Sequence, residues 1–162
     1  MATRTSRIGA IFYALWGVIH VIGGAVLLQA AFSGADAFLR VQAGGPALEP
    51  AALTVDARTL TIASGAFAFH AFNLTWIGVV VATVAMRLNW RNSAAGYWVN
   101  LALVGLTDLG LVLFIVGPGV MTWADAWIGP ALFVPAWLFA TIGRRSTPGL
   151  AASPDALRPA RT

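Results

Sequence analysis

Hydrophobic positions fill four long runs of the chain, and short polar segments separate them. The runs cover about residues 8–31, 60–86, 95–116 and 122–143. Each is near or above the ~20 residues that a helix needs to cross the hydrocarbon core of a bilayer. The pattern predicts an all-α fold, an integral membrane antiparallel bundle of four transmembrane helices that occupies residues 1–143.

Two segments outside these runs have a different composition. Residues 32–59 form a long connection on the outer side, where the turn-rich stretch "AGGPALEP" fits either a lid over a site or a plain loop. Residues 144–162 are rich in Pro, Ser, Ala and Arg and have few apolar side chains to bury. They predict a disordered basic cytoplasmic tail.

The overall composition narrows the class of protein further. Hydrophobic residues make up 59% of the 162 positions, which leaves too little polar surface for a soluble globule of this size. Cysteine is absent, which removes thiolate metal sites, disulfides and c-type haem attachment. Lysine is absent as well, so no Schiff base to retinal can form.

The arginines indicate how the chain is oriented in the membrane. Cytoplasmic flanks of membrane spans carry more Arg than translocated flanks. Eight arginines flank the predicted spans on one side, whereas the other side has only Arg40 and Arg58 together with several carboxylates. The eight are Arg4, Arg7, Arg87, Arg91, Arg144, Arg145, Arg158 and Arg161. We therefore expect a multi-pass protein with both termini in the cytoplasm. Binding of the arginines to anionic lipids of the bilayer accounts for the net charge of +4, so no nucleic-acid partner is needed to explain it.

A few polar side chains interrupt the apolar runs, most visibly in "FHAFNLTW", residues 69–76. At ~1.5 Å of rise per residue, His20 lies ~18 Å from the cytoplasmic end of its helix and His70 lies ~24 Å from that of the next. Asn73 and Asp108 both lie at ~20 Å. Three helices therefore place four polar side chains near one plane in the middle of the membrane.

Asp108 is the most informative member of this layer. An isolated carboxylate in hydrocarbon is so unfavourable that it must pair with a base, bind a cation or take a proton. A histidine at the same depth is the expected partner. We therefore interpret His20, His70 and Asp108 as candidate acid/base residues.

Neighbouring side chains supply candidate ligand contacts. Trp16 lies one turn to the cytoplasmic side of His20, and Trp76 lies one turn to the cytoplasmic side of Asn73. Together the two indoles would form the floor of a site. Further polar residues recur at helical spacing on one face of the third span. The candidate ligand-binding residues are Asn73, Trp16, Trp76, Tyr97, Asn100 and Thr107. A structural role is the alternative for each, because polar side chains also join helices in membranes and Thr107 can bond to its own helix.

These residues favour one function over several alternatives. The first hypothesis is a midplane His/Asp/Asn site that binds or transforms a hydrophobic small molecule, such as a lipid, quinone, isoprenoid or sterol-like compound, by acid/base chemistry.

Two alternatives involve a cofactor. His20 and His70 on different helices are the minimum axial pair for a haem b. His20, His70 and Asp108 together provide residue types that suit a divalent metal.

Two further alternatives need no cofactor. The chain can be an accessory subunit of a larger membrane complex, with the polar layer joining helices. It can also be a small proton-coupled transporter, in which Asp108 carries the proton and a homo-oligomer encloses the pathway.

Overall fold

The computed structural model describes residues 3–34 and 56–146. All regular secondary structure in these residues is helical, so the all-α prediction is confirmed for them. Most of the predicted connection 32–59 and of the predicted tail 144–162 lies outside the described residues. The elements are α1 (Arg4–Phe32), α3 (Ala57–Arg87), the short 3-10 helix η2 (Asn89–Arg91), α4 (Ala94–Leu111), the π-helical segment η3 (Val112–Val116), α5 (Trp123–Ala126) and α6 (Ile128–Arg145).

Three helical segments in the described residues are long and apolar enough to cross a membrane. They cover Arg4–Phe32, Ala57–Arg91 and Ala94–Val116. The fourth apolar run is divided at Trp127 into α5 and α6, and α6 ends in two arginines. Because of this division, the apolar part of α6 is shorter than that of the other three long helices.

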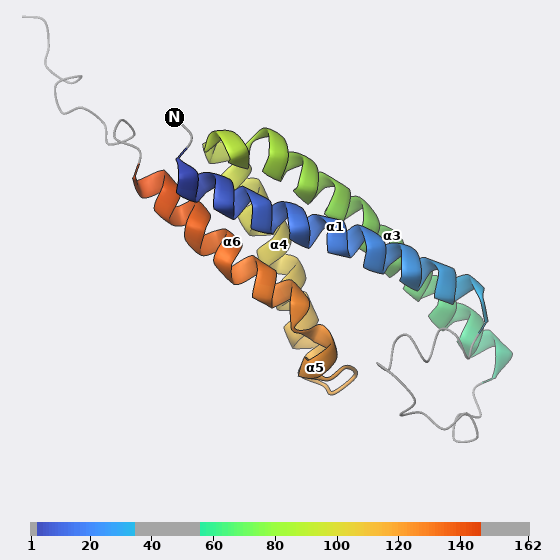
Figure 1. The fold of residues 1–162 in the computed structure, drawn as a ribbon. Coiled ribbons are helices and arrows are strands. Elements are labelled where there is room, and N and C mark those ends of the chain that lie inside the picture. Colours follow the sequence, from blue (N-terminus) through green and yellow to red (C-terminus); the bar gives the residue numbers. More distant parts are fainter. Residues whose placement is uncertain (1–2, 35–55, 147–162) are drawn as a thin grey trace, which may run out of the picture.

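Helix α1 lies between α3 and α6, with α4 behind it (Figure 1). Small residues allow the backbones to approach closely. A Cβ atom added to Gly17 would lie 2.6 Å from the carbonyl oxygen of Gly78 on α3, and one added to Gly9 would lie 2.7 Å from the amide nitrogen of Ala140 on α6. Glycine and alanine at such crossings are typical of helix association in membranes, where packing rather than water exclusion holds helices together.

The start of α1, the turn that contains η2 and the end of α6 meet at one end of the molecule. The guanidinium carbon of Arg7 lies 5.4 Å from the centre of the Trp90 ring, and the Asn92 side-chain amide donates to the Gly143 carbonyl oxygen at 3.1 Å. Figure 1 shows the start of α1 beside the end of α6. The described arginines of α1, η2 and α6 therefore gather at this end of the molecule, which we call the arginine-rich end.

Candidate functional site

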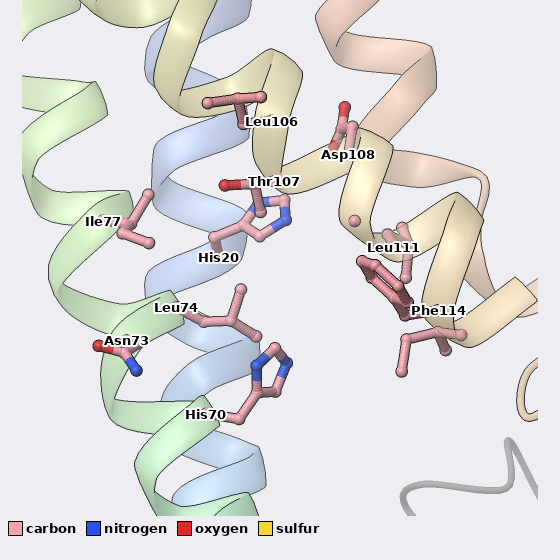
Figure 2. Close-up of a pocket in the computed structure, with 12 residues that line it drawn as sticks. His20, His70, Asn73, Leu74, Ile77, Leu106, Thr107, Asp108, Leu111 and Phe114 are labelled. Carbon is pink, nitrogen blue, oxygen red and sulfur yellow. The ribbon is translucent and has the colours of Figure 1, made fainter.

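A groove of about 400 Å³ lies between α3 and α4, with α1 behind it (Figure 2). Most of its lining is apolar, and polar side chains occur at a few points. The lining residues are His20, His70, Asn73, Leu74, Ile77, Leu106, Thr107, Asp108, Gly110, Leu111, Phe114 and Ile115. Such a mixture of apolar wall and few polar groups is typical of small-molecule sites.

Asp108 is held by a tryptophan from another helix. The indole Nε1–H of Trp16 donates to Asp108 Oδ1 at 3.2 Å. Trp16 is fully buried and Asp108 is only 5% exposed. The second carboxyl oxygen, Oδ2, is also buried and has no hydrogen-bond partner among the described residues. The observed partner of Asp108 is thus an indole, whereas depth alone pointed to a histidine.

The same tryptophan orients His20. The ring atom Nδ1 of His20 lies 2.8 Å from the main-chain carbonyl oxygen of Trp16, one helical turn earlier. The two rings also stack, with centroids 3.5 Å apart and planes 18° apart. A carbonyl oxygen only accepts hydrogen bonds, so Nδ1 carries the proton, and the neutral ring keeps Nε2 as an acceptor.

His20 and Asp108 meet beside a glycine of α6. A Cβ atom added to Gly129 would lie 2.9 Å from Asp108 Oδ1 and 3.6 Å from His20 Cε1. The absence of a side chain at Gly129 therefore leaves room for the Asp108 carboxyl group, whereas the His20 ring lies at an ordinary contact distance. Sequence reasoning missed this residue, because a glycine near a predicted helix start carries no signal that it faces a site.

His70 lines the groove from α3. In Figure 2 the ring of His70 lies on the same wall of the groove as the ring of His20, which comes from α1. It makes an edge contact with Phe67, with ring centroids 6.0 Å apart. Asn73 lines the groove but accepts a hydrogen bond from Trp76 Nε1 at 2.8 Å on the exposed side of the helix. Trp76 is 42% exposed, Trp16 is fully buried, and neither is among the lining residues, so the groove does not have the predicted indole floor.

Two other predicted site residues belong to a separate cluster near the arginine-rich end. The side-chain amide of Asn100 donates to the Val81 carbonyl oxygen at 3.3 Å and to Asn89 Oδ1 at 3.2 Å. The hydroxyl of Tyr97 lies 3.1 Å from that of Thr141. Neither residue lines the groove, and their contacts join α4 to α3, η2 and α6.

Thr107 does line the groove, but its hydroxyl donates to the Leu103 carbonyl oxygen of its own helix at 2.7 Å. The hydroxyl proton is therefore already used, and Thr107 keeps only acceptor capacity toward a ligand.

The geometry gives little support to the two cofactor alternatives. No group of three or more His, Asp or Glu side chains within residues 3–34 and 56–146 is arranged to hold a metal ion. A haem needs its two axial histidines on opposite faces of the ring. His20 and His70 instead project from two helices that touch at Gly17 and Gly78, and both rings point toward the same side, at different heights (Figure 2).

No protein-family model, curated protein or solved structure matches this chain. Function is therefore inferred from what the groove can do chemically. The groove has an apolar wall, the His20 imidazole with an unprotonated Nε2, and the buried carboxyl group of Asp108, one oxygen of which has no partner among the described residues. Such a set can hold the polar head of a largely apolar molecule and exchange a proton with it.

Proposed function

We propose that this chain is a four-span membrane protein with both termini in the cytoplasm, and that its groove binds a hydrophobic small molecule. The candidate ligands are lipids, quinones, isoprenoids and sterol-like compounds. One observation carries the proposal: an apolar groove of about 400 Å³ has His20 and Asp108 together in its wall.

The position of the groove between two helices supports entry from the bilayer. Leu106 is 69% exposed and Phe114 is 72% exposed, and both line the groove. In a membrane these side chains face hydrocarbon, so a ligand dissolved in the lipid reaches the groove without crossing water. A hydrophobic substrate partitions into the bilayer, and a lateral opening is the arrangement that suits it.

The chemistry proposed for the site is acid/base chemistry at His20. Its bare Nε2 accepts a hydrogen bond from the ligand head or removes a proton from it. The Trp16 carbonyl fixes the reactive tautomer, and the stacked indole fixes the ring plane. His70, farther along the same wall, donates to or accepts from a second polar atom of the ligand.

Native mass spectrometry of the protein from mild detergent tests the binding site. Leu111 lines the groove, whereas Leu109 on the same helix is 51% exposed and is not among the lining residues. We expect a discrete bound mass on the wild type and on Leu109→Trp, and its loss from Leu111→Trp, because the indole fills the groove. A bare wild-type mass, or a bound mass that Leu111→Trp retains, would contradict the proposal.

The absence of native cysteine allows a direct test of topology. We expect a single cysteine at Ser146, after the arginine-rich end of α6, to resist a membrane-impermeant maleimide added to intact cells. A cysteine at Thr122, before α5, should be labelled under the same conditions. Both positions are exposed, so a difference between them reports their side of the membrane. Labelling of Ser146→Cys in intact cells would overturn the proposed orientation.

A further inference from the structure

Asp108 has no cationic partner in the described part of the chain. One carboxyl oxygen accepts from Trp16, and the other is buried without a partner. No arginine lines the groove, and the chain has no lysine. The described arginines lie at or near the ends of the helices, and none is paired with Asp108.

In its ionised form, a buried carboxylate in this position needs a positive charge from elsewhere. Unpaired charges in hydrocarbon are so unfavourable that they are almost always paired or neutralised. A second acceptor lies close by, because His20 Nε2 is bare when the ring is neutral. Asp108 and His20 both line this end of the groove, which therefore has acceptors and few donors.

On this basis, and resting on the proposed function, we propose that the ligand is a hydrophobic amine. Its ammonium group pairs with Asp108 and donates to His20 Nε2, since an ammonium has three N–H donors and no acceptor. Its apolar chain runs along the groove from Asp108 toward Ile115, a helical distance of about 10 Å. A longer chain continues through the lateral opening into the lipid.

Other head groups fit the same corner less well. A phosphate or carboxylate head would place a second negative charge beside Asp108 with no cation to offset it. A hydroxyl head donates one hydrogen bond and leaves the charge of Asp108 uncompensated. A metal ion would need more ligands than the described residues bring together.

Binding of dodecylamine and dodecanol to the protein in phosphatidylcholine nanodiscs tests the inference, because the two probes share one chain and differ in the head group. On the wild type we expect dodecylamine to bind with a Kd about tenfold or more lower than that of dodecanol. Asp108→Asn should abolish the difference, since it keeps the shape of the side chain and removes its charge. Asp125→Asn is the matched control, because Asp125 is exposed and lies in α5, and it should keep the difference.

A second comparison needs no variant and so does not depend on how Asp108→Asn folds. The wild type should bind dodecylamine and should not bind dodecyl sulfate in the same groove. Equal binding of the two, or equal binding of dodecylamine and dodecanol, would overturn the amine assignment. If Leu111→Trp then abolished binding of the neutral probe, the groove would still be a ligand site. If Leu111→Trp left the binding of every probe unchanged, that result would instead overturn the proposed function.

Discussion

Gly17→Val is expected to separate α1 from α3 and to leave little stably folded protein. A Cβ atom at Gly17 would lie 2.6 Å from the Gly78 carbonyl oxygen, 2.8 Å from the Ala82 amide nitrogen and 2.9 Å from the Ala82 Cβ atom. Two of these atoms belong to the backbone of α3, which cannot move aside as a flexible side chain can. Overpacking a core costs about 1–3 kcal/mol and occasionally more, and we expect at least about 3 kcal/mol here. The measurement is the free energy of unfolding in mild detergent, together with the yield of monodisperse protein.

Gly23→Val is the matched control for this prediction. Gly23 lies on the same helix, and a Cβ atom added there meets no atom within 4 Å. The same substitution therefore tests helix propensity and hydrophobicity without the steric contact, and we expect a change of about 1 kcal/mol or less. Equal stability of the two variants would show that α1 and α3 do not touch at Gly17 and Gly78.

The contact at Gly17 lies close to the groove along α1. Gly17 is adjacent in sequence to Trp16 and lies one turn from His20, so the α1–α3 crossing lies at the level of the site. Close approach of the two helices brings His20 and His70 to one continuous wall, and α4 forms the opposite wall. The packing of α1 on α3 thus also places the two histidines on one wall of the groove.

Depth along a helix could be predicted from the sequence, and it located part of the site. A constant rise per residue places His20 and Asp108 near one plane, and the structure brings both beside Gly129. The helical class and the positions of the apolar runs follow from composition in the same way. Neither inference needs any knowledge of which helix faces which.

Rotation about the helix axes and the choice of neighbours could not be predicted. Tyr97 and Asn100 share a face of α4 with Asp108, but Asn100 lies eight residues earlier, about 12 Å away along the helix. They therefore contact η2 and α6 near the arginine-rich end and do not reach the groove. Trp76 was placed by its spacing from Asn73, yet the rotation of α3 leaves its ring 42% exposed. Without pairwise distances, periodicity cannot distinguish a lipid-facing side chain from one that lines a groove.

The partner of Asp108 shows the same limit at the level of single atoms. Trp16 lies one turn from His20 on the same helix, but the sequence indicated only a histidine as the partner of Asp108. Depth favoured the histidine, because the two side chains share a plane. The indole is longer and reaches Asp108 from one turn below, while the imidazole is turned toward the Trp16 carbonyl oxygen.

Trp16→Ala is expected to destabilise the protein by about 3–5 kcal/mol, because it removes a large, fully buried side chain from the centre of the core. Trp16→Phe is the more informative variant. It keeps an aromatic ring against His20 and leaves the main-chain carbonyl in place, but it removes the only described donor to Asp108. We expect Trp16→Phe to destabilise by about 1–3 kcal/mol, as for a buried acceptor that loses its partner.

A double-mutant cycle between Trp16→Phe and Asp108→Ala, which removes the acceptor oxygens, separates the hydrogen bond from the change in ring size. If the indole N–H stabilises the carboxylate, the two substitutions together should be less destabilising than the sum of their separate effects. Trp98→Phe provides the control, because Trp98 is 63% exposed and the substitution is the same. Additive effects, or a Trp16→Phe loss no larger than that of Trp98→Phe, would show that the N–H contributes nothing. Trp16 donates to Asp108 from its indole ring and accepts from His20 through its main-chain carbonyl oxygen. Trp16→Phe should therefore remove the hydrogen bond to Asp108 and leave the orientation of His20 unchanged.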